Sequence, residues 1–487
     1  MLGKYALATV LLWTETGALL AQEAANYALQ GVARSWHSHS VASVPCALVN
    51  DDDPLSFWGS NSPTTDPPKD IGIEWAEPRT FACVRVRFYS ERYVPAAEGW
   101  RLEALSDGRW QPLEALVENA ESARWTFRFD AITTTAVRLF VERYAKSRPA
   151  VNEFEVYEGN PPRPPFRRPP VLDGAFWAFH YEGWASHYET DDALAAEVDA
   201  AHAIGLDTII LYAVTGRNGR YSTAVPKTVV SQSPWWRGRD PIEAILSRAD
   251  ALGMHVYISD TTPNGYMHKQ PTPEAEAEST RLLGRYRRQV LDRYADHASL
   301  VGYYMNFECL PDDYANDATL PAAQAEALAI YIKGMNPNLK VIQPVGLYRW
   351  RDTKEAPWRH VTPAELSSFW KPFIAAAQHI DVFMVIDGIG TGLSPLNHTD
   401  VNQASIRNLC DQHDKEMWTD VECAEMGRRY VSYPIGRLIP ALEVAATHVE
   451  HIVTFDYINY MSPGNGRSQS AALYRHYKAY REDVLSD

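Results

Sequence analysis

The sequence predicts a two-domain protein in which an all-β sandwich is followed by a TIM barrel, the closed (β/α)8 fold. A proline-rich segment, GNPPRPPFRRPP (159–170), divides the chain, and prolines at this density favour an extended, semi-rigid linker. Before it, strand-like segments and turn signals occur without a convincing amphipathic helix. After it, eight strand-like runs alternate with helical stretches over about 315 residues, the size and count of a TIM barrel.

The bulk composition limits the domain count and the partners. A chain of 487 residues is too long for one compact core. The net charge of −15 argues against nucleic acid and anionic membranes as partners, because both bind basic patches. Five cysteines are too few for a disulfide scaffold, and spacing leaves a Cys46–Cys83 pair open. No CxxC or HExxH motif is present, so no metal site is predicted for catalysis.

Residues 1–21 resemble a secretory signal peptide, which predicts a secreted or periplasmic protein. Lys4 supplies the positive charge, Tyr5 to Trp13 the apolar stretch and Ala21 a small residue at the cleavage point. Glu15 interrupts the apolar region, and the alternative is a mobile or wrongly assigned N-terminus. No later segment has the roughly 18 continuous apolar residues of a membrane span.

Residues 26–158 contain the predicted sandwich. Six segments have strand character, and Ser106-Asp107-Gly108 forms a turn between two of them. The segments are IGIEW (71–75), ACVRVRFYS (82–90), WRLEAL (100–105), SARWTFRF (122–129), TAVRLFVERY (135–144) and FEVYEG (154–159).

This region resembles the discoidin-like (coagulation factor type C) galactose-binding domain and its carbohydrate-binding relatives. The resemblance implies a jelly-roll sandwich whose loops at one end bind sugar, and in many members a structural calcium ion. Asp51, Asp52 and Asp53 offer oxygen ligands to such a cation. The alternatives are a solvated acidic turn and a domain that acts only as a spacer. The motifs concerned are Asn26-Tyr27-Ala28, DPLSFW (53–58), Ile73-Glu74-Trp75, ALSDGRWQPL (104–113), TAVRLFVE (135–142) and VNEFEVYEG (151–159).

Residues 171–487 contain the predicted barrel. Asp240-Pro241-Ile242-Glu243 is typical of a helix start, and Gly205 and Gly253 stand where helices end. The rival fold, a doubly wound open sheet, would carry a Gly-rich loop after its first strand, which FWAFHYEGW lacks. The predicted strands are 174–181, 208–214, 255–260, 300–308, 340–346, 381–387, 416–422 and 451–460. The predicted helices are 191–204, 241–253, 273–297, 320–335, 363–378, 400–413, 434–448 and 468–482.

Glu308 and Glu422 are the predicted catalytic residues. They end the fourth and seventh strands, and the carboxyl ends of barrel strands carry catalytic groups. Two carboxylates across one barrel mouth suit glycosidic bond cleavage. Cys309 and Cys423 follow them directly and are expected behind the barrel wall. The predicted substrate-binding residues come from strand ends and loops and are mostly aromatic: Trp177, His180, Tyr181, Tyr212, Trp235, Trp236, Asn306, Trp350, Asp387, Trp418, Asp420 and Tyr457.

The barrel resembles the clan A glycoside hydrolases, and more closely an uncharacterised bacterial family of glycosidase-like TIM barrels. The second resemblance rests on GYYMNFE (302–308), VIDGIG (385–390) and WTDVE (418–422). The clan implies that Glu308 is the acid/base and Glu422 the nucleophile of a retaining mechanism. Its members usually have Asn directly before the acid/base, whereas here Phe307 intervenes and Asn306 is two residues back.

Retention implies carboxyl groups about 5–5.5 Å apart, and inversion implies roughly 6.5–9.5 Å. It also implies a raised pKa for Glu308 and an ionised Glu422. The sequence therefore predicts an exported glycoside hydrolase that acts on a poly- or oligosaccharide without a required cofactor. The alternatives are a non-catalytic carbohydrate-binding or adhesion protein with a degenerate barrel, and an enzyme that uses Asp387 and Asp420 with a metal.

Overall fold

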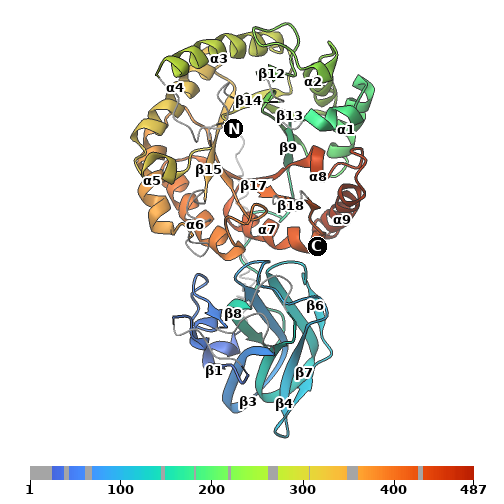
Figure 1. Ribbon diagram of the computed structural model, residues 1–487, viewed down its shortest axis with the longest axis vertical. Helices are drawn as coiled ribbons and strands as arrows, with labels where there is room; N and C mark the ends of the chain where they lie inside the picture. The colour runs from blue at the N-terminus through green and yellow to red at the C-terminus, as the bar shows by residue number, and fades with distance from the viewer. Residues whose placement is uncertain are drawn as a thin grey trace, which may run out of the picture.

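The computed structural model describes residues 25–37, 43–60, 68–143, 149–179, 182–217, 221–261, 273–306, 308–347, 360–425 and 431–486. The predicted signal peptide, 1–21, lies outside the described residues. So do His180, Tyr181 and Trp350 from the predicted site. The described chain forms a β-sandwich and a closed barrel, which lie end to end (Figure 1).

The N-terminal domain is an antiparallel sandwich of two layers. One layer contains β1, the first part of β3, the end of β7, β4 and β5. The other contains β2, β8, the second part of β3, the start of β7 and β6. The strands are β1 (Val32–Arg34), β2 (Trp58–Gly59), β3 (Lys69–Phe88), β4 (Trp100–Ser106), β5 (Arg109–Pro112), β6 (Leu116–Glu118), β7 (Arg124–Val141) and β8 (Ala150–Tyr157).

The sandwich fold is confirmed, but two long strands replace four predicted short ones. β3 runs through both 71–75 and 82–90, and β7 runs through both 122–129 and 135–144. Their pairing shifts register between Glu74 and Arg79 and again between Phe81 and Cys83. Such irregularities bend a strand, so each chain segment passes from one layer into the other without a loop.

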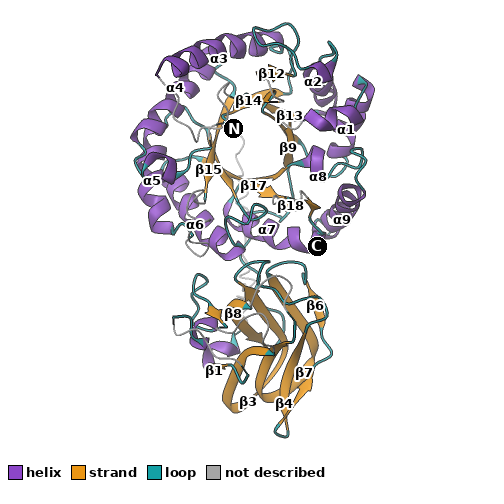
Figure 2. Cartoon of the chain, in the orientation of Figure 1, coloured by secondary structure: helices purple, strands orange, loops and turns teal. Residues whose placement is uncertain are grey.

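The C-terminal domain is a closed barrel of eight parallel strands surrounded by helices, which confirms the predicted (β/α)8 fold (Figure 2). The strands, in barrel order, are β9 (Gly174–Ala178), β10 (Thr208–Tyr212), β13 (His255–Ile258), β14 (Leu300–Tyr304), β15 (Lys340–Gly346), β16 (Val382–Ile386), β17 (Glu416–Glu422) and β20 (His451–Phe455). The helices that follow them are α1 (Asp191–His202), α2 (Pro241–Leu252), α3 (Pro273–Arg293), α4 (Thr319–Met335), α5 (Pro363–Ala376), α6 (Leu396–Gln412), α7 (Ile435–His448) and α9 (Ser468–Val484).

The eighth strand is shorter than its sequence suggests. It ends at Phe455, and a four-residue helix, α8 (Tyr457–Tyr460), follows it. Asp456 caps this helix, because its Oδ1 accepts a hydrogen bond of 2.8 Å from the backbone N–H of Asn459. A side-chain oxygen in this position stabilises a helix start, so the capping geometry overrides the β-rich run.

Side chains of the barrel strands alternate between two cores. Phe176, Tyr257 and Trp418 belong to the cluster inside the barrel. Trp177 belongs to the larger cluster between the strands and the helices. Cys309 and Cys423 belong to this outer cluster and are fully buried, as expected of residues that directly follow inward-facing ones.

The linker and the sandwich both contact the barrel. The backbone N–H of Arg167 donates to the carbonyl of Ala446 at the end of α7, and Phe166 packs against the outer cluster. Across the domain junction, Arg124 forms an ion pair with Glu443, and the ring of Tyr89 lies 5.9 Å from that of His398. The linker is therefore attached to the barrel and does not hold the two domains apart.

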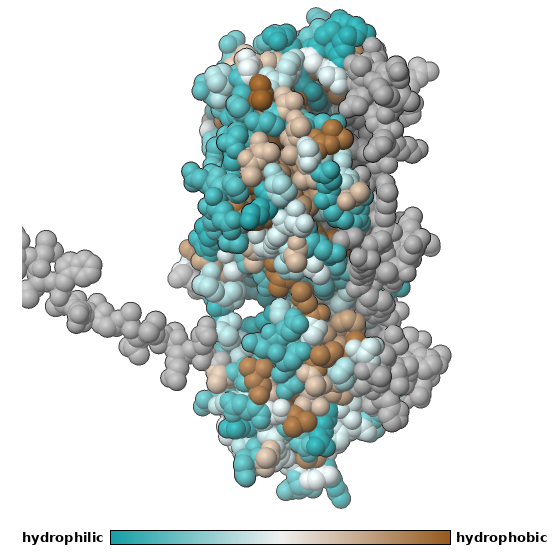
Figure 3. Space-filling view, turned by 90° about the vertical axis from the view of Figure 1, so that its left-hand side faces the viewer, coloured by the Kyte–Doolittle hydropathy of each residue, from teal (hydrophilic) through white to brown (hydrophobic). Residues whose placement is uncertain are grey.

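The surface is largely polar. Figure 3 shows a face on which hydrophilic residues predominate and hydrophobic ones are scattered. Within the described part of the chain, no helix has the length and apolar character that crossing a membrane requires. Cys46 and Cys83 are not joined by a disulfide.

Candidate active site

Glu308 lies just beyond the carboxyl end of β14, the fourth barrel strand. Its carboxylate Oε1 accepts a hydrogen bond of 3.1 Å from the hydroxyl of Tyr212, the last residue of β10. Tyr212 is 2% exposed, whereas Glu308 is half-buried. A rigid phenol therefore orients the Glu308 carboxyl while one side of the group stays accessible.

Glu422 ends β17, the seventh barrel strand, and a tight turn after β16 holds its carboxylate. Oε2 accepts a hydrogen bond of 2.8 Å from the backbone N–H of Thr391, and the N–H of Gly390 also bonds to the carboxylate. A Cβ atom on Gly390 would lie 2.9 Å from Glu422 Oε2 and 2.3 Å from the Ala424 carbonyl. The absence of a side chain at Gly390 therefore lets the turn approach Glu422 closely.

Asp387, the residue after β16, lies beside Glu422, whose backbone N–H donates to Asp387 Oδ2 at 3.3 Å. Burial raises the pKa of Asp387 well above its ordinary value, and the charge of Glu422 raises it further. The interaction between the two carboxyl groups raises the pKa of Asp387 and lowers that of Glu422. These effects favour the neutral form of Asp387.

Two further buried carboxyls complete an acidic barrel mouth. Burial and the charges of Asp387, Glu422 and Glu308 raise the pKa of Asp420 well above its ordinary value. Burial raises the pKa of Asp456 to about 7. Among the described residues, no Lys or Arg forms an ion pair with Asp387, Asp420 or Glu422, and Asp420 Oδ1 has no hydrogen-bond partner there.

Glu308 and Glu422 act on one another electrostatically. Burial raises the pKa of Glu422 to about 7, and the charge of Glu308 contributes to this rise. The retaining mechanism implies an ionised Glu422, so the raised pKa differs from that expectation. Desolvation outweighs the three hydrogen bonds that favour the carboxylate form.

The described residues contain no cluster of side chains suited to bind a metal ion. No group of three or more His, Cys, Asp or Glu side chains in these segments is placed to hold a metal ion. In the sandwich, both oxygens of Asp51 accept from the hydroxyl of Ser56, at 2.9 and 3.0 Å. Asp53 Oδ1 accepts from the backbone N–H of Leu55. Two of the three aspartates that could bind calcium are therefore hydrogen-bonded within their own turn.

Four predicted substrate-binding aromatics prove to be packing residues. Trp177 and Tyr457 stack on one another in the outer cluster, with ring centroids 5.9 Å apart, and both are fully buried. Trp236 is also fully buried in that cluster. Trp418 points into the barrel, as strand alternation requires, but near its base, where its ring lies 4.2 Å from that of His451. Their burial contradicts these four predictions. Trp177 and Trp418 lie on barrel strands, which bury both faces, and Trp236 and Tyr457 lie in η4 and α8, which pack into the outer cluster.

Asn306 faces the same way along the chain as Tyr304, an inward residue, and is half-buried. Its Oδ1 is buried without a hydrogen-bond partner in the described part of the chain.

Trp235 is 49% exposed and lies in a pocket on the barrel rim. A second pocket, of about 570 Å³, lies between α4 and α5, away from the carboxylates.

Two functional elements were missed in the sequence. The turn with Gly390 and Thr391 lies in the VIDGIG segment, whose Gly-rich character signals close approach of a backbone. Glu189 and Arg237, which border the rim pocket, lie in loops and carry no motif.

The fold and the site define a (β/α)8-barrel protein whose mouth gathers buried carboxyls, preceded by a β-sandwich. Residues 172–467 match the family described as Domain of unknown function (DUF4434), and the chain belongs to this family. No curated protein matches the chain in sequence.

Solved structures resemble the chain in fold. A protein from Bacteroides thetaiotaomicron VPI-5482, provisionally described as an alpha-L-fucosidase, is 18% identical with a TM-score of 0.51, and the match covers 65% of this chain and 95% of that one. The family 32 CBM from C. perfringens NanJ, in complex with galactose, is 13% identical with a TM-score of 0.23, and covers 28% of this chain and 98% of that one. Chitosan-binding module 1 of a chitosanase/glucanase from Paenibacillus sp. IK-5 is 18% identical with a TM-score of 0.23, covering 27% and 98%. The barrel thus has a glycosidase-like fold.

Proposed function

We propose that this protein is a glycoside hydrolase that cleaves a poly- or oligosaccharide with retention at the anomeric carbon. The proposal is carried by Glu308 and Glu422, which end the fourth and seventh barrel strands and influence one another's ionisation. Two carboxyl groups that flank one bond are the minimum set for glycoside hydrolysis.

The proposed reaction is a double displacement. Glu422 attacks the anomeric carbon while Glu308 protonates the leaving oxygen, which gives a glycosyl-enzyme and a free alcohol. Glu308 then takes a proton from water, and the resulting hydroxide displaces Glu422. The Tyr212 hydroxyl orients Glu308 through both steps.

The cluster of carboxyl groups at the barrel mouth supports this assignment. The transition state of glycoside cleavage has oxocarbenium character, so positive charge develops at the sugar ring. Carboxylates in a low-dielectric site interact with such a charge more strongly than they would in water. This charge develops beside Glu422 in the transition state, where the ionised carboxylate stabilises it.

The test compares sugar release by wild type, Glu308→Gln and Glu422→Gln on plant, algal and bacterial polysaccharides. Both variants are expected to lose at least about 10³-fold in kcat, near the upper end of a single catalytic group's contribution. Glu416→Gln is the matched control, because Glu416 lies at the other end of β17 in an ion pair with Lys340. The first product should keep the anomeric configuration of the substrate, which NMR during early turnover measures.

Three results would contradict parts of the proposal. Inverted product would assign Glu422 as a base for water. If one of the two variants keeps full activity, the catalytic role of the substituted Glu would be assigned to Asp387 or Asp420 instead. If no polysaccharide is cleaved but one binds wild type and both variants equally, the protein is a carbohydrate-binding protein with a degenerate barrel.

We also propose that the chain is exported and that the sandwich binds carbohydrate, on the basis of the N-terminal sequence pattern and the motif order described above. Protein recovered outside the cytoplasm should begin near Glu23, after removal of the apolar segment, and mass spectrometry of the intact chain measures this. A chain that retains Met1 and stays in the cytoplasm would contradict export.

A further inference from the structure

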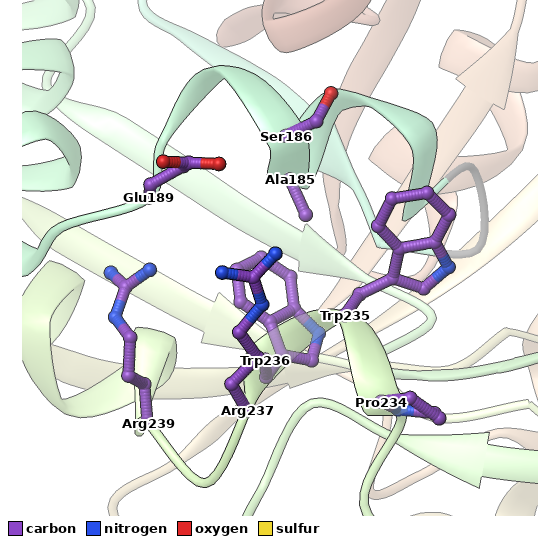
Figure 4. A pocket seen from close by; sticks show the side chains of 8 residues that line it. All are labelled: Ala185, Ser186, Glu189, Pro234, Trp235, Trp236, Arg237 and Arg239. Carbon is purple, nitrogen blue, oxygen red and sulfur yellow. The ribbon is translucent and has the colours of Figure 1, made fainter.

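A small pocket opens on the barrel rim, built by the loops after the first two strands. η3 (Glu182–His187) follows β9, and η4 (Pro234–Trp236) lies in the segment between β10 and α2. The pocket has a volume of about 250 Å³. Figure 4 shows its lining, with Ala185, Ser186 and Glu189 on one side and Pro234, Trp235, Trp236, Arg237 and Arg239 on the other.

The pocket offers one flat apolar surface. Trp235 is 49% exposed, although large aromatic side chains are usually covered in a folded protein. Its neighbour Trp236 is fully buried and lies 5.7 Å from Phe179, ring to ring, which anchors η4 to the barrel. Trp236 therefore fixes the backbone that presents Trp235.

The pocket also offers one donor group and one acceptor group that the protein does not use. Neither Arg237 nor Glu189 forms an ion pair or hydrogen bond within the described residues, and both are exposed. Arg239, in contrast, is committed: it donates to Asp191 Oδ1 at 2.7 Å and to the Tyr188 carbonyl at 2.9 Å.

The backbone at Arg237 is held in a conformation that arginine rarely adopts. Its φ of 49° is in the left-handed region, which costs on the order of 1 kcal/mol for a residue with a Cβ. Such residues persist where the surroundings determine them, and they gather at ligand sites. The Arg237 side chain lines the pocket together with Trp235 (Figure 4).

We propose that this rim pocket binds one neutral sugar ring of a carbohydrate chain, an inference that rests on the proposed function and names the ligand class it uses. Trp235 stacks on the apolar face of the ring, Arg237 donates to hydroxyl or ring oxygens, and Glu189 accepts from hydroxyls. The volume is below the roughly 300–1,000 Å³ of sites for larger ligands, which suits a single ring.

The charges favour a neutral sugar over an acidic one. Arg239 is neutralised by Asp191, and the remaining charges of Arg237 and Glu189 cancel. A carboxylated sugar would gain from Arg237 but would be repelled by Glu189 and by a protein of net charge −15. Hydroxyl groups, which donate and accept, satisfy both side chains at once.

The experiment measures the 19F NMR resonance of Trp235 in the full-length protein. Tryptophan is replaced biosynthetically by 5-fluorotryptophan, and Trp235→Phe assigns the Trp235 resonance in the 19F NMR spectrum. The carrier variant is Glu422→Gln, so that turnover does not consume the probe. The probes are neutral hexasaccharides of glucose, mannose, galactose and N-acetylglucosamine, and hexagalacturonate as the acidic probe.

The expected result is a saturable shift of the Trp235 resonance with at least one neutral hexasaccharide and none with hexagalacturonate. Glu189→Gln and Arg237→Met should each raise the Kd from this shift about tenfold, and Leu320→Ala, an exposed apolar residue on α4, should leave it unchanged. A shift with hexagalacturonate alone would overturn the neutral-sugar assignment, and no shift with any probe would overturn the site.

Failure of this inference is distinguishable from failure of the proposed function. If wild type cleaves a polysaccharide but the Trp235 resonance never responds, the hydrolase stands and the rim site is wrong. If the resonance responds but no substrate is cleaved, the rim site stands and the catalytic proposal is wrong. Binding through the sandwich does not affect either outcome, because the resonance reports only on Trp235.

Discussion

Two buried carboxyl groups of the sandwich, Asp70 and Glu103, lie beside an arginine, whereas three buried carboxyl groups of the barrel mouth have no such partner among the described residues. Asp70 and Glu103 are 1% and 3% exposed, and Arg138 lies between them with N–O distances of 2.8 and 2.6 Å. In the barrel mouth, Asp387, Asp420 and Glu422 are as deeply buried, and no cation in the described residues pairs with them. A buried charge is destabilising unless it is paired. The two groups of carboxyls should therefore respond differently to substitution and to pH.

The largest effect is expected from removing Arg138, the cation that lies between Asp70 and Glu103 in the sandwich. Arg138→Met should lower the free energy of unfolding of the sandwich by about 3–5 kcal/mol, because it removes the buried cation shared by two carboxylates and leaves Asp70 with His37 and Glu103 with the more exposed Arg101. Thermal denaturation followed by circular dichroism measures this. Arg34→Met, which removes a largely exposed pair with Glu74, is the control and should change stability by less than about 0.5 kcal/mol. A small effect of Arg138→Met would show that the two regions do not differ as described.

The second largest effect is expected at Gly390, which lies in the turn that holds the Glu422 carboxylate. Gly390→Ala should lower kcat about 10²-fold, because the new Cβ displaces the Glu422 carboxylate from its backbone donors. KM should change little, since Gly390 acts by positioning Glu422. Gly334→Ala on α4 is the matched control, because its Cβ would meet nothing within 4 Å. Equal losses in both variants would point to a general effect on folding.

The third effect is the pH dependence of the buried carboxyls. The pKa of Glu422 is raised from about 4.3 in an unfolded chain to about 7 in the fold. The native state therefore binds the extra proton between these values, and this stabilisation is full below about pH 4 and lost as pH rises through 7. Relative to wild type, Glu422→Gln should gain on the order of 2 kcal/mol between pH 4 and pH 8.

Chemical denaturation across that pH range tests the gain. Comparing wild type with the variant cancels the titrating groups that do not interact with Glu422, and Glu416→Gln at the other end of β17 is the control. A constant difference between wild type and Glu422→Gln would show that Glu422 is ionised throughout the range.

The smallest effect is expected from His398 at the domain junction, where the fold lowers a pKa and stability falls toward acid pH. Burial lowers the pKa of His398 to about 3, from about 6.5 in an unfolded chain. The native state binds fewer protons in this interval, so stability falls as pH falls below 6.5. His398→Phe should reduce acid sensitivity by on the order of 1 kcal/mol at pH 5. Melting curves at pH 5 and pH 8 measure this, with the exposed His476→Gln as control; an unchanged acid sensitivity would contradict it.

The barrel could be predicted from sequence because each of its units carries a local signal. Apolar runs repeat eight times, capping residues and glycines mark some of the helix ends, and all eight strands and helices occur where the pattern predicts them. The exceptions arise where a tertiary contact competes with local preference. β3 and β7 of the sandwich continue through segments that look like turns, and Asp456 ends the eighth strand by capping α8.

The site was predictable only in part. Strand position was enough to select Glu308, Glu422 and the neighbouring Asp387 and Asp420, because side-chain alternation is regular. It failed for Trp177, Trp236, Trp418 and Tyr457, because residue type does not tell a packing aromatic from an exposed one. Gly390, Arg237 and Glu189 depend on loop conformation, which a single sequence does not specify.

One consequence concerns where the barrel can be separated from the rest of the chain. Asp173 joins the first and last strands, since its carboxylate accepts from the backbone N–H of Ile452 at 2.7 Å and also binds the guanidinium of Arg168. Arg168 in turn donates to the carbonyl of Glu450. A truncated protein that begins at the first strand would lose these bonds between the first and last strands, where the barrel closes. Recombinant versions of the barrel alone should therefore begin before Phe166, inside the proline-rich segment, so that Arg168 and Asp173 are kept.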